Sequence, residues 1–546
     1  MIKITLLLSV LFFSLAQAQT FEWVDVIPID IQTNPSLLES AVAVDNTGNP
    51  VCARLIDSRE IYNLNYFGDV KIEKRSSSGL LMWENTIDGK AHVSDLIVDG
   101  ENNTICIGAY RDTISIDTAQ LIYSGSQTGS FILKLDDSGN LIWLKDGTEL
   151  STVINVMTAL ARDGFNNYLL GISNLPIDSK ILKLDTGGNI ISTIDQNSVR
   201  TVSDISQDVF NNIWVTGFTS TSNQSFNGLD TIAPFPYSEY VVKYNSSGTA
   251  EWVTFIEDVT DQDFNIETDN AGNAYLSGNL FISTTFGNLT ANGPQWVYDY
   301  FVTKISPDGN FIWLNEIPPG NPAGDATIGN SNFLFCSENG RTYITGFFRG
   351  TINFGGGIML NPITSPDVFV VSYSPDGEIQ WAKSAGSSFY DQGNSITGDD
   401  NGNLYISGVV AENSEFDTIS VAGGNQNLFL TRLKTDDAVS VENELTENIP
   451  VVNDFTLMQN YPNPFNPTTN IRFSIPAVEM HRDAFLQTTL KVYDVLGNEV
   501  ATLVNENKEA GIYEVDFSAM GITSGIYFYR LTAGEYKATK KMIILK

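Results

Sequence analysis

A repeated unit fills most of the chain and limits what it can fold into. Seven times, an alternating apolar segment of the form x-F-V-x-K-x leads into a turn. These copies occupy residues 71–79, 131–139, 181–188, 241–248, 301–309, 369–377 and 428–437. Seven times, a second turn starts a further strand, at residues 45–50, 99–104, 163–168, 208–213, 269–274, 337–342 and 399–404. A period of about 50 to 70 residues is typical of propellers and other repeat architectures.

Each copy is predicted to form four strands. A short strand ends in Asp, a turn rich in Asp, Asn and Gly precedes the second strand, the x-F-V-x-K segment is the third, and a fourth follows its turn. The fourth strand usually contains a tryptophan: Trp83, Trp143, Trp252, Trp313 or Trp381. The copy at Gly188 has Ile190 and Ile191 there, so we interpret this position as an apolar packing slot. A radial array of such sheets is a β-propeller.

The two ends of the repeat region predict how the ring closes. The last copy, at residues 428–433, has no fourth strand after it. Residues 21–24, which contain Trp23, form a tryptophan strand that precedes the first copy. We therefore expect the N-terminal strand to complete the last blade, which gives seven blades.

The repeats resemble the SBBP-type bacterial β-propeller repeat. The resemblance lies in the order D-x-F-V-x-K-Y-x-x-x-G-x-x-x-W followed by D-x-x-G-N-x-Y-x-x-G, and is strongest in the copies that hold Phe301 and Phe369. The segment FFRGTINFGG, from Phe347, also fits the G-T-x-x-F-G element of these repeats. The resemblance implies a propeller over residues 19–437 and an extracellular setting, and it implies no reaction.

Export is also predicted by the first residues and by the charge of the chain. Residues 1–18 carry one Lys, an apolar run and the triplet Ala-Gln-Ala, the pattern of a secretory signal peptide cleaved before Gln19. The formal net charge of −34 repels phosphate backbones, so nucleic acid is not an expected partner. We interpret the acidic residues as a solvated surface, with cation binding as the alternative.

Cysteine and histidine offer few chemical candidates. Cys52, Cys106 and Cys336 have neither zinc spacing nor a C-x-x-C arrangement, and we expect all three to be small buried apolar residues. The only histidines are His92 and His481, and we interpret both as surface residues. No G-x-S-x-G, H-E-x-x-H or glycine-rich phosphate loop is present.

The turns show partial resemblance to two classes of functional propeller and suggest one metal hypothesis. The turns SPDGNFIW and SPDGEIQW miss the spacing of the sialidase Asp box by one residue. The segment KLDDSGNLIW, at residues 134–143, resembles the tryptophan docking motif of quinoproteins, but no residues for a metal and quinone site can be nominated. Calcium at the D-x-x-G-N turns is a third hypothesis, although such turns fold without metal.

These observations lead to two hypotheses for the ring. The first is that it is not an enzyme but a non-catalytic binding or adhesion module for a glycan or protein, because no catalytic signature is found. The alternative is a polysaccharide-acting hydrolase or lyase that uses carboxylates near the central channel. The candidate carboxylates for the alternative end the first strands: Asp45, Asp99, Asp208, Asp269 and Asp399. The competing interpretation is that these are hairpin-turn residues.

A second domain follows the repeats. Residues 438–454 are acidic, lack the repeat motif and read as a linker. Residues 455–546 contain a proline-rich entry and further alternating segments, which predict a small β-sandwich. The predicted fold class is thus all-β, a seven-bladed β-propeller followed by a small immunoglobulin-like β-sandwich.

The tail closely resembles the type A C-terminal sorting domain of the bacterial type IX secretion system, a relative of the FlgD Ig-like fold. The motifs are NYPNPFNPTT from Asn460, LKVYDVLGNEV from Leu490, SGIYFYRL from Ser524 and the terminal KKMIILK. The resemblance implies export to the medium or the cell surface, with the secretion machinery at the outer membrane as partner. The motif residues it nominates are Asn460, Tyr461, Pro462, Asn463, Pro464, Phe465, Tyr493, Asp494, Gly497, Gly525, Tyr527, Lys540 and Lys541.

Overall fold

The computed structural model divides into two compact units, residues 1–440 and 441–546, which are described separately. The structure describes residues 19–435 except 30–33, 64, 126, 151–155, 175–177, 220–222, 236–237, 258–263, 294–298, 319–323, 364–365 and 400. In the second unit it describes residues 455–545 except 459, 461–462, 464, 466, 476–485, 509–510 and 535. The expected signal peptide and linker, residues 1–18 and 438–454, lie outside the described residues.

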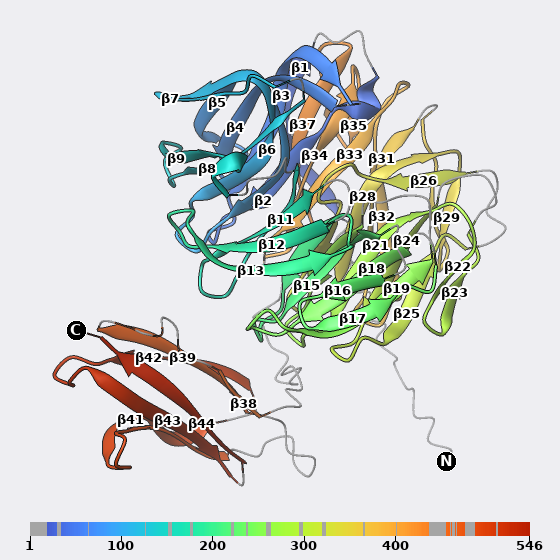
Figure 1. The fold of residues 1–546 in the computed structure, drawn as a ribbon. Helices are drawn as coiled ribbons and strands as arrows, with labels where there is room; N and C mark the ends of the chain where they lie inside the picture. Colours follow the sequence, from blue (N-terminus) through green and yellow to red (C-terminus); the bar gives the residue numbers. More distant parts are fainter. Residues whose placement is uncertain are drawn as a thin grey trace, which may run out of the picture. The chain divides into compact units, whose positions relative to one another are not determined.

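The first unit is a ring of seven four-stranded antiparallel blades (Figure 1). The inner strands, which line the central channel, are β2 (Ser40–Val44), the second half of β5 (Leu81–Val98), β10 (Val156–Arg162), β14 (Asp204–Gln207), β20 (Asn265–Thr268), β26 (Asp325–Ile328) with β27 (Leu334–Cys336), and β33 (Gln392–Gly398). The second strands are β3 (Pro50–Tyr62), β6 (Thr104–Ile116), β11 (Tyr168–Asn174), β15 (Ile213–Thr219), β21 (Ala274–Leu280), β28 (Thr342–Arg349) and β34 (Asn403–Ala411).

The outer half of each blade follows the same order. The third strands are β4 (Asn65–Arg75), β8 (Gly129–Leu135), β12 (Asp178–Leu184), β18 (Ser238–Tyr244), β24 (Asp299–Ile305), β31 (Asp367–Tyr373) and β37 (Gln426–Lys434). The fourth strands are the first half of β5, β9 (Leu141–Asp146), β13 (Ile190–Asn197), β19 (Ala250–Glu257), β25 (Phe311–Glu316), β32 (Ile379–Ala385) and β1 (Thr20–Ile29). The short helices are η1 (Pro35–Leu37) and α1 (Gly147–Leu150).

Hairpins lie between the second and third strands of five blades. Their strands are β7 (Ala119–Ile122), which pairs with the end of β6, then β16 (Asn223–Phe226) with β17 (Leu229–Ile232), β22 (Thr284–Phe286) with β23 (Leu289–Ala291), β29 (Ile352–Gly355) with β30 (Ile358–Leu360), and β35 (Glu415–Phe416) with β36 (Ile419–Ser420).

The N-terminal strand closes the ring as predicted. β1 pairs antiparallel with β37, so that Trp23 lies opposite Arg432 and Ile27 opposite Leu428. Figure 1 shows the two ends of the repeat region side by side in one blade. Buried side chains join this blade to the first one, because Cys52 packs with Tyr405 in one hydrophobic cluster. The ring is therefore held at its seam by backbone pairing and by packing.

The outer-strand tryptophans dock on the next blade. The Trp83 indole nitrogen donates to the Asp137 carbonyl oxygen at 3.0 Å, and the Trp313 indole nitrogen donates to that of Pro375 at 3.0 Å. Trp23, Trp143 and Trp252 make the equivalent bond at distances of 3.0–3.3 Å. Each indole covers a glycine of positive φ in the turn between the third and fourth strands; a β-carbon at Gly139 would lie 2.6 Å from the Trp83 ring.

One blade fills this slot differently from the prediction. Ile190 and Ile191 are 45% and 48% exposed, so the expectation that they take the tryptophan's place is wrong. Ile194 takes it instead, since a β-carbon at Gly248 of the next blade would lie 2.9 Å from its side chain. The first four residues of β13, beginning with Ile190, are exposed, and the first buried side chain of the strand is that of Ile194.

The second unit is a β-sandwich. One sheet contains β38 (Thr456–Leu457), β39 (Thr468–Ile475) and β42 (Gly511–Ser518). The other contains β41 (Glu499–Lys508), β40 (Leu486–Tyr493), β43 (Gly525–Ala533) and β44 (Tyr536–Ile544). Ile471 and Phe473 of the first sheet share one buried cluster with Leu490 and Tyr529 of the second. Within the described residues, no helix is long and apolar enough to cross a membrane.

Candidate functional site

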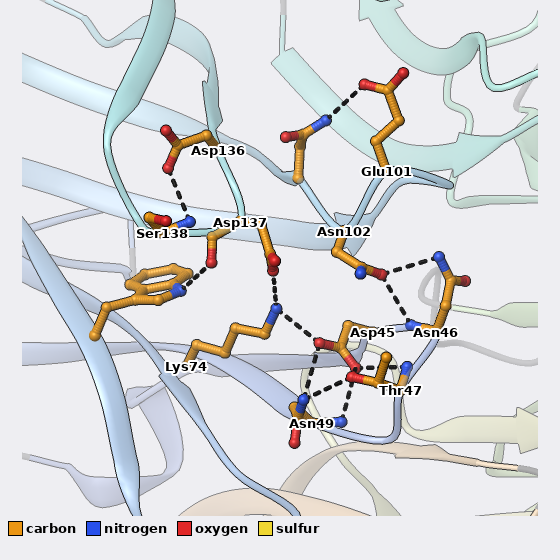
Figure 2. Close-up of polar contacts among 12 residues, drawn as sticks. Asp45, Asn46, Thr47, Asn49, Lys74, Glu101, Asn102, Asp136, Asp137 and Ser138 are labelled. Carbon is orange, nitrogen blue, oxygen red and sulfur yellow. Dashed lines mark hydrogen bonds and ion pairs between the residues drawn. The ribbon is translucent and has the colours of Figure 1, made fainter.

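The aspartates that end the inner strands are bound within their own turns. Asp45 Oδ1 accepts from the backbone amides of Thr47 at 2.8 Å and Asn49 at 2.9 Å. Lys74 Nζ lies 2.7 Å from Asp45 Oδ2 and also contacts Asp137, as Figure 2 shows. Burial alone would raise the pKa of Asp45, but Lys74 and the turn amides outweigh it and lower that pKa. Asp45 is thus an ionised turn residue.

The same pairing recurs around the ring. The lysine of the x-F-V-x-K strand lies near the turn aspartate of its own blade in Lys134–Asp99 at 3.0 Å, Lys183–Asp163 at 2.5 Å and Lys304–Asp269 at 3.7 Å. In Asp399, the carboxylate accepts from the amides of Asn401 and Asn403. Asp208 differs, because burial raises its pKa, and it accepts from the indole nitrogen of Trp214 at 3.2 Å. The turn interpretation therefore accounts for these aspartates.

A different pair of carboxyl groups faces the channel. Residues 204–207 of β14 and 267–268 of β20 line one cavity in the channel, so these positions face the channel. Asp204 and Glu267 occupy such channel-facing positions and are half-buried. Ser206 Oγ links the two strands, since it lies 3.3 Å from Glu267 Oε2 and 3.2 Å from Thr268 Oγ1. Carboxyls of two neighbouring blades therefore line the same part of the channel.

These carboxyls line a cavity of about 300 Å³. Its polar wall contains Arg162, Asp204, Ser206, Gln207, Glu267, Thr268 and Asn332. Arg162, Gln207 and Thr268 are the last residues of β10, β14 and β20. The cavity consequently reaches the rim of the ring at which the inner strands end.

Burial changes the acidity of the channel carboxyls. Loss of solvation raises the pKa of Glu267 to about 7 and raises that of Asp204 well above its usual range. The two groups also repel each other, since the Glu267 charge adds to the shift of Asp204. Against this, Asp204 accepts from the amides of Ile205 and Ile266, both at 2.8 Å. At neutral pH this pair retains a proton, as one of two interacting carboxyls in a poorly solvated site does.

A third carboxyl, Asp95 on β5, lies beneath the cavity and is buried. Burial raises the pKa of Asp95 to about 6. Its oxygens accept from the amides of Leu96 at 2.7 Å and Leu160 at 2.8 Å and from Asn332 Nδ2 at 2.7 Å. Because these donors come from three blades, Asp95 holds the channel wall together and adds negative charge below the pair.

Sequence reasoning nominated carboxylates at the rim where the inner strands end and did not identify Asp204, Glu267 or Asp95. The D-x-x-N turn drew attention to the strand ends, whereas the channel-facing residues lie before the turn. The available signal is a Glu or Asp at alternate positions of the short inner strands. It is weak, because any solvent-facing position of a strand shows the same pattern.

The histidine prediction is wrong for His92, whereas the cysteine prediction is confirmed. His92 is 8% exposed, and its Nε2 lies 3.0 Å from Glu39 Oε2. His481 lies outside the described residues. Cys52, Cys106 and Cys336 are free thiols and all buried. Burial raises the pKa of Cys52 to about 12, which makes it an inert packing residue.

No group of three or more His, Cys, Asp or Glu side chains suited to a metal ion occurs in the described part of the chain. The turn aspartates use their oxygens on backbone amides and lysines, as set out above. Calcium at these turns stays a hypothesis from the sequence.

The nominated tail residues have different structural roles. Asn460 is buried, and its backbone amide nitrogen donates to the Tyr529 hydroxyl at 2.7 Å. Phe465 is buried and forms a parallel bridge with Ile544, while Asn463 Oδ1 accepts from the Ile543 amide at 2.7 Å. The N-terminal segment of the tail is thus bound to the last strand. Tyr461, Pro462 and Pro464 lie outside the described residues.

The remaining nominated residues lie in the sheet of β40, β41, β43 and β44 and its turns. Tyr493 packs under the Arg530 guanidinium, whose centre is 5.0 Å from the ring, and Asp494 caps the turn that contains Gly497. Gly525 begins β43, and the Tyr527 hydroxyl donates to the Thr523 carbonyl oxygen at 3.0 Å. Lys540 and Lys541 are exposed on β44.

Residues 459–545 match the family described as the secretion system C-terminal sorting domain. The chain is therefore exported by the type IX secretion system to the cell surface or the medium, and its tail interacts with that system. The match covers the tail and does not extend into the ring. None of the curated proteins matches this sequence.

Several solved structures are similar to the chain at low sequence identity. An α-L-arabinanase of Penicillium chrysogenum, complexed with arabinobiose, is 9% identical, with a TM-score of 0.33, over 77% of this chain and 98% of that one. An α-L-arabinofuranosidase of Fusarium graminearum, complexed with an iminosugar inhibitor, is 8% identical, with a TM-score of 0.34, over 78% and 99%. PhoX of Pseudomonas fluorescens, complexed with vanadate, is 8% identical, with a TM-score of 0.33, over 77% and 97%.

These structures contradict the prediction that the chain is not an enzyme. That prediction depended on the lack of a catalytic motif, and the solved structures with a similar fold include two glycosidases. The lack of a motif therefore excludes no reaction. At such identities and scores the likeness concerns the fold alone and assigns no substrate, so the chemistry has to be argued from the channel itself.

Proposed function

We propose that this exported propeller is a polysaccharide-acting hydrolase whose reaction takes place in the central channel. The observation that carries the proposal is the pair Asp204 and Glu267, two carboxyls with raised pKa that line one cavity. Hydrolysis of a glycosidic bond requires one carboxyl group that donates a proton and a second that is ionised. An interacting pair that retains a single proton supplies both.

The roles within the pair follow from the hydrogen bonds of each carboxyl. Asp204 accepts two amide hydrogen bonds of 2.8 Å, which favour its charged form. Glu267 accepts a longer bond of 3.3 Å from Ser206. Burial raises the pKa of both carboxyls, so the pair is treated as sharing one proton, and the hydrogen bonds are used to place it. On that basis we assign Glu267 as the general acid and Asp204 as the carboxylate that activates water or attacks the sugar.

The location of the protein and the shape of the ring support a polymeric sugar as the substrate. A type IX cargo works outside the cell, where polysaccharides are available, and the cavity opens at a rim of polar turns. In this proposal a glycan is the substrate of the ring, whereas in the binding hypothesis it was only a ligand. We further propose, from the sequence motifs, that the blades are SBBP-type repeats and that the tail is an immunoglobulin-like sandwich of the FlgD type.

The test is an activity screen of the exported protein on a panel of plant and microbial polysaccharides. New reducing ends are expected from at least one of them, and Glu267→Gln and Asp204→Asn are expected to lower the rate by about 100-fold or more. Glu378→Gln is the matched control, because Glu378 is exposed in the turn between β31 and β32. A panel with no product, or an E267Q variant as active as the wild type, would refute the proposal.

A further inference from the structure

The inner strand of the sixth blade is interrupted within the channel. Residues 329–333 separate β26 from β27, and we call this segment the crossbar. Within it, Asn332 Nδ2 donates to Asp95 Oδ1 of the second blade at 2.7 Å. The Phe333 amide donates to Asn265 Oδ1 of the fifth blade at 2.8 Å. The crossbar therefore joins blades on opposite sides of the ring.

The other side of the crossbar is bound equally well. The Ile396 amide donates to the Asn332 carbonyl oxygen at 2.7 Å, and the Ser331 amide donates to that of Asn394 at 3.2 Å. Asn330 Nδ2 donates to the Ser36 carbonyl oxygen at 2.6 Å, ahead of the first blade. These bonds fix the crossbar to the seventh blade and to the segment before the first.

The hydrogen bonds of the crossbar and its neighbours lie at one level of the channel. Asp95 also binds the Leu160 amide, and Asp204 binds the Ile266 amide. Four inner strands and the crossbar thus contribute one residue each to a polar layer: Asp95, Leu160, Asp204, Asn265 and Asn332.

The cavity lies on one side of this layer. In every one of these strands, the lining residues are the layer residue itself or residues that follow it: Ile97, Ala161 and Arg162, Ser206 and Gln207, Glu267 and Thr268, and Leu334. Because the inner strands of a propeller run in the same direction, all of these residues lie above the layer. The polar layer is therefore the floor of the cavity, and the rim where the strands end is its mouth.

From this geometry we infer that the channel accepts the free end of a polysaccharide chain and releases one terminal sugar at a time. The inference rests on the proposed function. A polysaccharide chain cannot pass through a channel that is closed by a hydrogen-bonded floor. Because Asp204 belongs to that floor, a glycosidic bond cleaved there lies close to the end of the polysaccharide. The cavity volume of about 300 Å³ is at the small end of ligand pockets, which suits a single sugar.

The experiment uses the full-length exported protein and a polysaccharide that it cleaves. Viscosity is compared with reducing ends during the reaction, and oligosaccharides labelled at the reducing end are followed by chromatography. We expect a monosaccharide to be the first product and the remaining chains to shorten by one sugar at a time. We also expect the viscosity to fall slowly. Early products of intermediate length, with a steep fall in viscosity, would overturn the inference and leave the hydrolase intact. A folded protein that cleaves nothing would overturn both.

A variant of the floor supplies a second readout. Asn332→Ala removes the bond to Asp95, and we expect the share of products longer than one sugar to rise several-fold. Asn330→Ala is the matched control on the crossbar, because Asn330 binds the Ser36 carbonyl oxygen and does not line the cavity. An N332A protein that is folded and has the wild-type product pattern would count against the floor as the cause of end-specific cleavage.

Discussion

Arg54 and Asp25 join the two ends of the ring, with Arg54 Nη2 lying 2.6 Å from Asp25 Oδ2. Asp25 is on the N-terminal strand in the seventh blade, whereas Arg54 is on β3 in the first. The guanidinium also contacts the buried Glu73 carboxylate and donates to the Leu428 carbonyl oxygen at 3.3 Å. Arg54 is fully buried, and Asp25 adds a second carboxylate to that of Glu73 when the N-terminal strand is in place.

Arg54→Met is predicted to destabilise the ring by roughly 3–5 kcal/mol, because it leaves Glu73 buried next to fewer positive charges. All eight tryptophans lie before residue 382, so tryptophan fluorescence during denaturant unfolding reports the ring alone. The control is Arg59→Met, which removes an exposed ion pair with Asp57 and is expected to cost about 0–1 kcal/mol. Equal losses in the two variants would contradict the role of Arg54 at the seam.

The docking of tryptophans on turn glycines predicts that alanine substitution destabilises the ring by different amounts at two glycines of equal φ. Gly139 and Gly357 both have φ of +84°, but a β-carbon at Gly139 meets Trp83, whereas at Gly357 it meets nothing within 4 Å. Gly357→Ala should cost about 1–2 kcal/mol from the backbone alone. Gly139→Ala should cost roughly 1–3 kcal/mol more from the clash. The measurement is denaturant unfolding, and the docking account is incorrect if the two losses agree.

The pH dependence of stability should contain a contribution from Asp367. This residue is 2% exposed, its Oδ1 has no hydrogen-bond partner within the described residues, and burial, aided by Asp391, raises its pKa to about 7. The folded state therefore holds a proton that the unfolded chain loses near the ordinary aspartate pKa of 3.8. Because the folded state binds more protons between these values, this carboxyl reduces stability as pH rises from about 4 to about 7.

Asp367→Asn is thus expected to stabilise the ring by roughly 1–4 kcal/mol above pH 7, with a gain that vanishes near pH 4. Unfolding free energies across this pH range check the effect. Asp376→Asn, at an exposed turn position, serves as the control and should be neutral throughout. A D367N gain that is equal at both ends of the range would show that ionisation is not its cause.

Removal of residues 455–546 should leave the ring in the periplasm, because the sorting domain directs passage across the outer membrane. Cell fractionation locates the truncated protein, and its tryptophan emission shows whether the ring has folded. Truncated protein found in the medium at the level of the full chain would contradict the role of the tail.

Sequence reasoning predicted the features that depend on local pattern. The strand alternation, the turn residues and the unpaired tryptophan strand at Trp23 were sufficient for the blade count and for the seam. The tail motifs predicted export in the same way. Each of these signals lies within one contiguous stretch of residues, so no knowledge of the folded ring is needed.

The channel site could not be predicted, because it exists only after seven blades have closed. Glu267 and Asp204 are 63 positions apart, and each looks like an ordinary solvent-facing strand residue. The crossbar reads as an irregular turn. His92 was misassigned for a similar reason, since its partner Glu39 lies just before a different strand, β2, and nothing local indicates burial.

The most direct test of the account is the protonation state of Glu267 in the resting protein. The infrared difference spectrum between the wild type and Glu267→Gln reports the carbonyl stretch of a protonated carboxyl, and needs no substrate. We expect this band to be present at about pH 6 and to disappear as the pH rises through about 7. A Glu267 carboxyl that is already fully ionised at about pH 5.5 would contradict the claim that the channel holds a proton donor.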